Sequence, residues 1–210
     1  MKKVVIFDFD YTLGDSTEGI VQSINYALEC IGMETAGRDK IVKTIGMSLA
    51  KTYEVLTGKN NPQEIKTFEK YFKEKADEVM VSNTSLYNGV AKMLENLHGK
   101  GLKTAIVTTK YHYRIEQILK VNNVVHLVDG IIGCEDVSLP KPAPEGIFKI
   151  KELFNVSPKE ILYIGDSLVD AETAQAAGVD FTAVLTGQAL RSEFQKYPYA
   201  SIINKVTDLG

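Results

Sequence analysis

Three aspartates stand where apolar segments of the chain end, and their spacing suits metal binding and nucleophilic chemistry. Asp8 and Asp10 follow the apolar run KVVIF, and Asp166 follows EILYI. Because Asp8 and Asp10 are two residues apart at an expected strand end, their side chains project to the same side, about 7 Å apart. Their repulsion of roughly 2 kcal/mol raises the pKa of one of them or recruits a cation. Hard oxygen ligands select Mg2+, so we expect a magnesium site.

Lys141 and Thr108 suit the binding of a phosphate group. Lys141 lies in the segment KPAP, and Thr108 ends another apolar run. A lysine ammonium neutralises the charge of phosphoryl oxygens, and a hydroxyl donates a hydrogen bond to them. Together with a carboxylate nucleophile and a divalent cation, these groups are the parts that phosphoryl transfer requires. The residue types therefore predict chemistry on a phosphate.

The segments that must position these residues alternate between strand and helix patterns. Short β-branched apolar runs, typical of buried parallel strands, occupy residues 3–7, 102–107 and 160–164, with further short strands expected at 130–133, 181–185 and 201–203. Helical spacing separates them, at residues 90–97, 113–121, 145–154 and 171–177. The alternation predicts a doubly wound parallel α/β sheet, Rossmann-like, with its ligand site at the carboxyl ends of the strands.

Between about residues 15 and 84 this alternation stops. Three stretches with amphipathic helical spacing, and no strand pattern between them, occupy residues 18–31, 40–56 and 62–81. The polar, turn-prone segments GDST and SNTS flank the region, as expected for two hinges. We therefore predict an α/β core domain of residues 1–14 and 85–210, with a helical cap domain of residues 15–84 inserted into it.

The composition argues against several classes of function. A chain of 210 residues can bury a sizeable core, and its hydrophobic fraction of 44% is that of a globular protein. A net charge of -3 provides no basic field, so we expect no nucleic-acid partner. Only four apolar residues separate Lys3 from Asp8, so we expect no signal peptide, no membrane partner and a cytoplasmic location. Cys30 and Cys134 lack metal-ligand spacing, and we expect both to be buried.

Four segments, in order along the chain, resemble the signatures of the haloacid dehalogenase superfamily. They are DFDYTL at residues 8–13, the apolar run ending at Thr108, Lys141 in KPAP, and GDSLVD at residues 165–170. A lone DxDxT motif is weak evidence, whereas the ordered set is far more specific. The resemblance covers essentially the whole chain and implies a phosphatase.

The resemblance implies a role for each matching acid. Asp8 would attack phosphorus and form an aspartyl-phosphate, while Asp10 would protonate the leaving oxygen and later activate water. Magnesium would be bound by the carboxylate of Asp8, the main-chain carbonyl of Asp10 and Asp166. Asp170 would bind the metal through water or orient Lys141.

The phosphate-binding residues implied by the resemblance include two departures from the usual pattern. Thr108 and Lys141 would hold the phosphoryl oxygens, with Thr12 and Thr109 beside them. Tyr11 replaces the glycine that is usual in the first signature, and Thr109 occupies a position often held by asparagine or glycine. Tyr11 therefore adds bulk beside the phosphate pocket, which bears on the substrate more than on the reaction.

The inserted region resembles the helical cap of the phosphoglycolate phosphatase branch. TIGMSL at residues 44–49 is similar to the cap loop of that branch, which makes Gly46 and Ser48 candidates for contacting the substrate. A closing cap excludes water and selects substrates. The resemblance thus implies a Mg2+-dependent phosphomonoester hydrolase that acts on a small phosphorylated metabolite. We expect a monomer or a homodimer, between which the sequence does not decide.

Several alternatives stay open. A β-phosphoglucomutase-like phosphotransferase would keep the covalent intermediate but pass the phosphoryl group to a second sugar hydroxyl. A pyrophosphatase or nucleotidase would differ from the main hypothesis only in its substrate. A non-catalytic protein with the same fold would bind a phosphorylated metabolite without turning it over, although the presence of both Asp8 and Asp10 argues against this.

Overall fold

The computed structural model describes residues 1–209, which form two compact units. Of the described residues, the first unit combines Met1–Asp15 with residues 86–209, and the second comprises Ser16–Ser85. Each join lies one residue later than the boundary expected from the sequence, which placed the inserted region at residues 15–84. The inserted region is therefore a compact body with its own internal contacts.

The first unit is built on one six-stranded sheet in which all neighbouring strands are parallel. Its strands are β1 (Val4–Phe7), β4 (Lys103–Val107), β5 (Gly130–Ile132), β6 (Ile161–Gly165), β7 (Asp180–Val184) and β8 (Ser201–Ile203). Their order across the sheet is β5-β4-β1-β6-β7-β8. All four residues of β1 are buried, as expected for an apolar strand that is covered on both faces.

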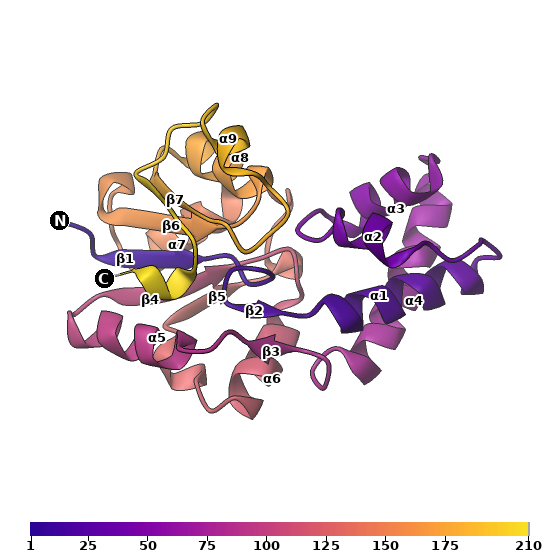
Figure 1. Cartoon of the computed structure of the whole chain (residues 1–210), viewed down its shortest axis with the longest axis horizontal. Coiled ribbons are helices and arrows are strands. Elements are labelled where there is room, and N and C mark those ends of the chain that lie inside the picture. The colour runs from indigo at the N-terminus through magenta and orange to yellow at the C-terminus, as the bar shows by residue number, and fades with distance from the viewer. Residues whose placement is uncertain (210) are drawn as a thin grey trace. The chain divides into compact units, whose positions relative to one another are not determined.

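Helices lie on both sides of this sheet (Figure 1). They are α5 (Val90–Gly99), α6 (His112–Val121), α7 (Glu145–Leu153), α8 (Leu168–Ala177) and α9 (Arg191–Phe194), with 3₁₀ turns at Val125–Leu127, Cys134–Asp136, Pro158–Glu160 and Val206–Asp208. The start of α8 is capped by the Ser167 hydroxyl, which accepts a hydrogen bond from the amide of Asp170. The doubly wound parallel α/β sheet predicted from the sequence is confirmed.

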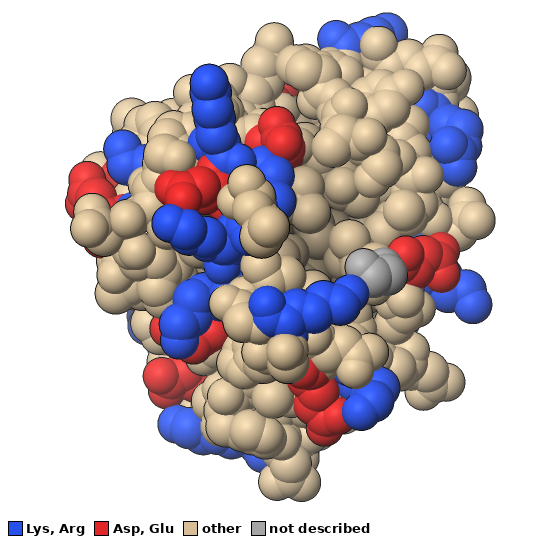
Figure 2. All heavy atoms as spheres, turned by 90° about the vertical axis from the view of Figure 1, so that its left-hand side faces the viewer, with Lys and Arg blue, Asp and Glu red and all other residues tan. Residues whose placement is uncertain are grey.

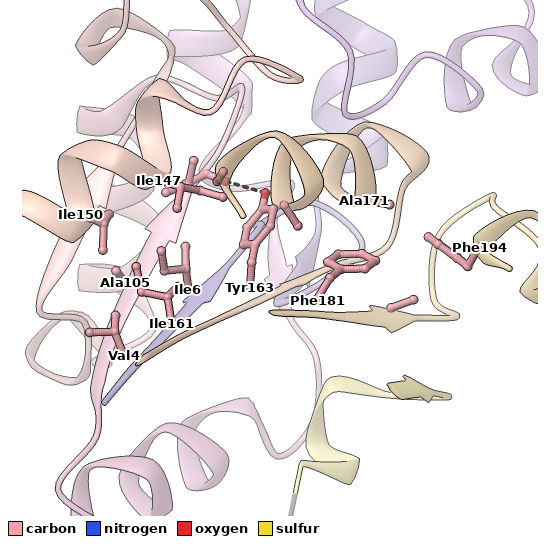
Figure 3. Close-up of a cluster of buried hydrophobic side chains, with 14 residues drawn as sticks. Val4, Ile6, Ala105, Ile147, Ile150, Ile161, Tyr163, Ala171, Phe181 and Phe194 are labelled. Atoms are coloured by element: carbon pink, nitrogen blue, oxygen red, sulfur yellow. Dashed lines mark hydrogen bonds between the residues drawn. The ribbon is translucent and has the colours of Figure 1, made fainter. Parts of the chain in front are cut away.

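One face of the sheet packs against α7 and α8 through a continuous apolar core (Figure 3). Val4 and Ile6 of β1 and Ile161 of β6 belong to this core, because alternate residues of a strand share a face. Ile147 packs onto them from α7. Tyr163 of β6 lies in the same cluster, although its hydroxyl forms hydrogen bonds with polar groups. The apolar core therefore reaches directly to the polar end of the sheet.

The second unit is helical and has its own core. Its elements are α1 (Thr17–Cys30), α2 (Arg38–Val42), α3 (Leu49–Thr57) and α4 (Pro62–Val79), and the paired two-residue strands β2 (Gly14–Asp15) and β3 (Ser85–Leu86) lie where the chain enters and leaves it. Ile24, Tyr53 and Phe68 are fully or almost fully buried in this core. The tilted ring contact of Tyr53 with Phe68, at 5.4 Å between centroids, joins α3 to α4.

The prediction of one continuous helix over residues 40–56 was wrong. The structure has two helices here, because α2 ends at Val42 and α3 begins at Leu49. Gly46 has a φ of 94°, a left-handed conformation that interrupts a helix. The Ser48 hydroxyl then accepts a hydrogen bond from the amide of Lys51 and caps α3. Apolar spacing continues across this break, so the periodicity did not reveal it.

The surface shown in Figure 2 carries basic and acidic side chains that are interspersed with each other and with neutral residues. In two ion pairs with one exposed and one partly exposed partner, Lys2 lies 2.7 Å from Asp180 and Lys3 lies 2.6 Å from Glu160. Within residues 1–209, no helix has the length and apolar character needed to cross a membrane.

The expectation that both cysteines are buried was wrong. Cys30 is exposed and Cys134 is partly exposed. Cys30 is the last residue of α1, and Cys134 begins a 3₁₀ turn. Both positions lie at the ends of elements, where a side chain can reach solvent.

Candidate active site

Asp8 and Asp10 lie in a tight turn immediately after β1. The main-chain carbonyl of Phe9 accepts hydrogen bonds from the amides of residues 12–14, which curls the chain at the end of the strand. The amide of Asp8 still donates to the carbonyl of Ile164, at 2.8 Å, and so continues the pairing of β1 with β6. Asp8 and Asp10 are only 2% and 7% exposed. The turn therefore fixes two acids in a nearly buried position.

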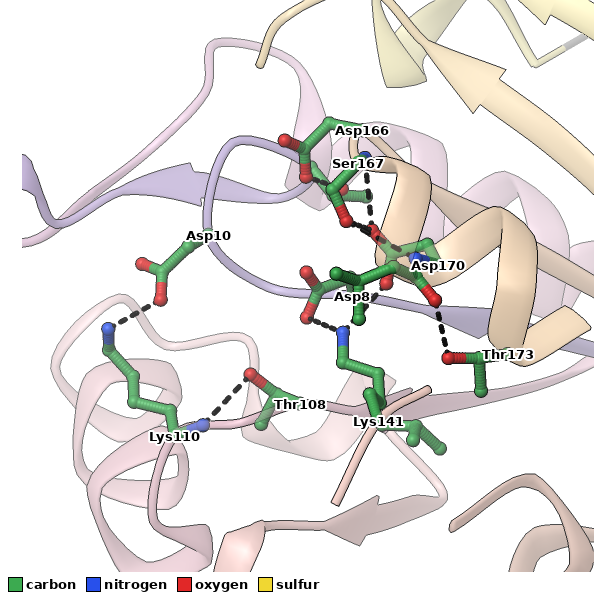
Figure 4. A network of polar contacts seen from close by, with 12 residues as sticks. Asp8, Asp10, Thr108, Lys110, Lys141, Asp166, Ser167, Asp170 and Thr173 are labelled. Carbon is green, nitrogen blue, oxygen red and sulfur yellow. Dashed lines mark hydrogen bonds and ion pairs between the residues drawn. The ribbon is translucent and has the colours of Figure 1, made fainter. Parts of the chain in front are cut away.

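β6 and α8 bring two further acids to the same place. Asp166 directly follows β6, and Asp170 lies in the first turn of α8. Asp8, Asp166 and Asp170 each offer a carboxylate oxygen, and these oxygens lie within 4.8 Å of one another. Figure 4 shows Asp8, Asp166 and Asp170 close to one another, and the strands that precede Asp8 and Asp166, β1 and β6, are neighbours in the sheet. The carboxyl edge of the parallel sheet thus assembles acids that are far apart in the sequence.

Lys141 reaches this acidic cluster from the loop that precedes α7. Its Nζ lies 3.0 Å from Asp8 Oδ1 and 2.7 Å from Asp170 Oδ1. Thr108 directly follows β4, and Thr108, Thr109 and Lys141 line one small hollow together. The structure therefore brings Lys141 to a cluster of three of the four acids that the sequence singled out, and the two threonines line a hollow with the same lysine. The carboxylate of the fourth acid, Asp10, lies 2.7 Å from Lys110 Nζ instead.

Burial makes the acidic cluster electrostatically unfavourable. It raises the pKa of Asp8 to about 7, and the charges of Asp170 and Asp10 add to this rise while Lys141 opposes it. Burial also raises the pKa of Asp166 well above its ordinary range, with Asp170 and Asp8 contributing through their charges. The site therefore favours protons or cations on these two carboxylates.

Lys141 and Asp170 stabilise each other's charged forms. Burial alone would raise the pKa of Asp170. The Lys141 ammonium has a larger effect in the opposite direction, so the pKa of Asp170 lies below its ordinary value. For Lys141 the penalty of burial is likewise outweighed by Asp170 and Asp8, so its pKa rises above the ordinary value. Both groups therefore stay charged near neutral pH.

The acidic cluster fits a divalent metal ion. Lys141 supplies one positive charge against the carboxylates of Asp8, Asp166 and Asp170, all of which are buried. The remaining negative charge is what favours protonation of Asp8 and Asp166, and a bound cation would neutralise it instead. All the donors are hard oxygens, which suit Mg2+.

Tyr11 and Thr12 shape the loop that carries the first two acids. Tyr11 has a φ of 58°, a left-handed conformation in which glycine is favoured, and its carbonyl accepts a hydrogen bond from the Thr186 hydroxyl. The Thr12 hydroxyl donates to Asp166 Oδ1 at 3.0 Å. Contact of either residue with a phosphate stays a prediction. Their hydrogen bonds join the loop after β1 to Thr186 and to Asp166.

Gly46 and Ser48 belong to the second unit. Gly46 adopts the left-handed turn between α2 and α3, and Ser48 caps α3. These local roles account for both residue types, and their contact with a substrate stays a prediction.

Lys110 is a site residue that sequence reasoning missed. Its Nζ lies 2.7 Å from Asp10 Oδ2, and its side chain is nearly buried. The available signal was its position two residues beyond Thr108, at the same strand end as other polar site residues. That signal is weak, because a lysine just before a helix is more often exposed to solvent.

Tyr163 and Gly187 were missed as well. The Tyr163 hydroxyl donates to Asp170 Oδ1 at 2.7 Å and lies 3.2 Å from Lys141 Nζ. Gly187 packs so closely on Asp166 that an added Cβ would lie 1.9 Å from Asp166 Oδ2. In the sequence, Tyr163 has the pattern of a core residue in an apolar strand, and Gly187 that of an ordinary turn residue. Both nevertheless help to fix the positions of acids in the cluster.

Comparisons with known proteins point to one family. A family model described as haloacid dehalogenase-like hydrolase matches residues 5–184. A phosphoglycolate phosphatase from Aquifex aeolicus is 30% identical over 186 residues, which cover 88% of this chain and 85% of that protein. A pyrophosphatase PpaX from Bacillus mycoides is 29% identical and covers 98% of this chain and 94% of its own length.

Solved structures show the same similarity. A structure from Bacteroides fragilis, described as a haloacid dehalogenase-like hydrolase, has a TM-score of 0.96 and 40% identity, with each chain covered completely. A structure described as a predicted phosphoglycolate phosphatase from Haemophilus somnus has a TM-score of 0.87 and 25% identity, covering 99% of this chain and 96% of that one.

Proposed function

The chain belongs to the haloacid dehalogenase-like hydrolases and is a phosphatase, and on this basis we propose that it hydrolyses a small phosphomonoester through an aspartyl-phosphate on Asp8. The observation that carries the proposal is the convergence of Asp8, Asp166, Asp170 and Lys141 at the carboxyl edge of the sheet. Nucleophile, acids and counter-charge are then present in one buried place.

Asp8 would act as the nucleophile and Asp10 as the acid and base. A carboxylate oxygen of Asp8 attacks phosphorus, the bond from phosphorus to the leaving oxygen breaks, and Asp10 gives a proton to that oxygen. Asp10 then removes a proton from a water molecule that attacks the phosphorus of the aspartyl-phosphate. This step releases inorganic phosphate and restores Asp8. The burial of both side chains supports these roles, because it keeps bulk water from the reacting groups.

Magnesium is the cofactor we propose. The Asp8 carboxylate, the main-chain carbonyl of Asp10 and Asp166 would hold it, with Asp170 close enough to contribute through water. When bound, the ion supplies positive charge that offsets the charge of the acids and of the phosphate. The contact of 2.7 Å between Asp170 and Lys141 supports the orienting role for Asp170.

The remaining core residues would bind the transferred phosphoryl group. Lys141 and Thr108 would donate to its oxygens, with Thr109 in the same hollow and Tyr11 and Thr12 in the loop after β1. The backbone hydrogen bonds of Asp8 and Thr108 to neighbouring strands support this role, since positioned donors need no rearrangement during the reaction.

We propose that the helical unit of residues 15–84 is a cap that selects the substrate, with Gly46 and Ser48 on its substrate-contacting loop. Its separate core supports the role of a body able to move as a whole. The named relatives suggest phosphoglycolate as the first substrate to test and pyrophosphate as the second. Each of these has a leaving group that bears negative charge.

Release of phosphate from a panel of phosphorylated metabolites tests the proposal. With millimolar Mg2+, we expect hydrolysis of at least one small phosphomonoester or of pyrophosphate, and loss of that activity when the metal is chelated. No release from any member of the panel would favour a non-catalytic binding protein. Isomerisation of a sugar phosphate without release of phosphate would favour a phosphotransferase.

A further inference from the structure

Lys110 is a second buried lysine of the site, and it contacts a different aspartate from Lys141. Its Nζ lies 2.7 Å from Asp10 Oδ2, and the two side chains are 5% and 9% exposed. Lys141 contacts Asp8 and Asp170 instead. Figure 4 shows these as separate pairs, with Lys110 directed to Asp10 and Lys141 directed to Asp8. The site therefore has one cation at the nucleophile and another at the proposed general acid.

The backbone around Lys110 is held by hydrogen bonds to neighbouring segments of the core unit. Its amide donates to the Thr108 hydroxyl at 3.2 Å, and its carbonyl accepts from the amide of Cys134 at 3.0 Å. The ammonium also lies 6.0 Å from the centre of the Phe9 ring. Together with the buried ion pair to Asp10, these contacts restrict the ammonium, so that a ligand would have less side-chain freedom to order.

A buried lysine must be compensated, and Asp10 provides that compensation in the free protein. An ammonium carries three N–H groups, so the contact with Asp10 leaves Lys110 able to donate to a second acceptor. That acceptor would lie next to Asp10. In the proposed reaction, this is where the leaving oxygen and the atoms attached to it must be.

We infer that Lys110 is a specificity-determining residue that binds an anionic oxygen group on the leaving part of the substrate, close to the scissile bond. The inference rests on the proposed function, in which Asp10 faces the leaving oxygen. A carboxylate or second phosphate brought into this buried place would be costly without a partner, and a lysine beside it offsets that cost. Lys141 contacts the proposed nucleophile Asp8, whereas Lys110 contacts Asp10, so Lys110 is the lysine placed on the side of the leaving group.

A matched pair of substrates isolates the charge that Lys110 would bind. Phosphoglycolate and the phosphate ester of glycolamide differ only in that a carboxylate is replaced by a neutral amide. We expect the wild-type enzyme to prefer phosphoglycolate, in kcat/KM, by about tenfold or more. Lys110→Met should lose most of this preference, and Lys110→Arg, which keeps the positive charge, should retain it. Pyrophosphate measured in parallel shows whether Lys110 matters more for a substrate whose leaving group carries a carboxylate or for one whose leaving group is a phosphate.

The control is Lys120→Met, which removes an exposed lysine of α6 and should leave both substrates unaffected. Equal losses for the acid and the amide in Lys110→Met would show that Lys110 acts only through Asp10, and would overturn the inference. A wild-type enzyme that hydrolyses neutral leaving groups as fast as anionic ones would overturn it too, even if the methionine variant failed to fold. Absence of phosphate release from every substrate would instead count against the proposed function.

Discussion

The apolar core and the acidic cluster are built from the same strands, yet burial affects them in opposite ways. β1 contributes Val4 and Ile6 to the core and ends just before Asp8, while β6 contributes Ile161 and ends just before Asp166. In the core, each square ångström of buried apolar surface stabilises the fold by roughly 25 cal/mol. In the cluster, burial raises the pKa of Asp8 and Asp166 and disfavours their charged forms. The strand interiors thus hold the acids in an arrangement that is unfavourable for their charged forms, and that a bound cation would make favourable.

Asp8→Asn should abolish activity without lowering stability, and so should give the largest difference between the acidic cluster and the apolar core. Turnover should fall by about four orders of magnitude or more, because the amide cannot form the acyl-phosphate. The melting temperature of the metal-free protein should not fall, since one buried negative charge beside Asp166 and Asp170 is removed. Steady-state phosphate release and thermal melts measure the two effects.

The matched control for this prediction is Asp39→Asn, which changes an exposed aspartate of α2. It should alter neither turnover nor melting temperature. Appreciable residual turnover in Asp8→Asn would remove Asp8 from the role of nucleophile, whatever happened to stability.

The stability of the metal-free protein should depend on pH in the direction set by the acidic cluster. The folded-state pKa of Asp8, about 7, lies above its ordinary value of 3.8, so the folded state binds a proton more tightly than the unfolded state. The resulting stabilisation is present below pH 4 and is lost as the pH rises through 7, by at most about 4 kcal/mol. Asp166 acts in the same direction, whereas Asp170, with its lowered pKa, acts in the opposite one.

Saturating Mg2+ should flatten this dependence and raise the melting temperature near pH 7.5, because the ion takes the place of the protons. Urea unfolding at several pH values, with metal and with chelator, measures how the free energy of unfolding depends on pH. Without metal, the free energy of unfolding of the Asp8→Asn variant should depend less steeply on pH than that of the wild type. Identical slopes with and without Mg2+ would mean that the ion does not bind these acids.

Shortening a core side chain should affect stability with little effect on chemistry. Ile6 is fully buried, and Ile6→Ala should lower the free energy of unfolding by about 3 kcal/mol through lost burial and the cavity left behind. The kcat/KM of the folded variant should change by less than about threefold, since the amide of Asp8 still pairs with Ile164. Urea unfolding and phosphate release test this, with Ile6→Val as the milder step. A large loss of activity in a folded variant would show that the two regions are coupled.

The sheet could be predicted from the sequence because its strands are short, apolar and separated by helical spacing. The inserted region was harder: one predicted helix proved to be α2 and α3, since the left-handed Gly46 and the capping Ser48 break it without disturbing the apolar pattern. A local conformation of this kind depends on a single φ angle. Hydrophobic periodicity averages over many residues and does not detect it.

Site residues could be singled out where they follow an apolar run or match a motif, as Asp8, Asp166 and Lys141 do. Lys110 and Tyr163 could not, for two different reasons. Lys110 becomes a site residue only through its contact with Asp10, 100 positions earlier in the chain. Tyr163 has the pattern of the core, and only the packing of β6 against α8 directs its hydroxyl to the acidic cluster.

Tyr163 joins the two regions, so its substitution gives the smallest and sharpest test of the comparison. Its ring packs in the apolar core, while its hydroxyl donates to Asp170 Oδ1 at 2.7 Å and lies 3.2 Å from Lys141 Nζ. Tyr163→Phe keeps the ring and removes the hydroxyl. Because Asp170 retains its ion pair with Lys141, the free energy of unfolding should fall by only about 1 kcal/mol.

The kcat/KM of Tyr163→Phe should fall by about tenfold, because Lys141 and Asp170 lose a group that fixes their positions. Tyr197→Phe is the matched control, since Tyr197 also packs against the apolar core but bonds to Glu172, outside the acidic cluster. It should leave kcat/KM unchanged. Equal effects of the two substitutions on kcat/KM would show that the Tyr163 hydroxyl has no particular role in positioning the acidic cluster. A loss of activity confined to Tyr163→Phe would show that one side chain can stabilise the apolar region with its ring and position the acidic cluster with its hydroxyl.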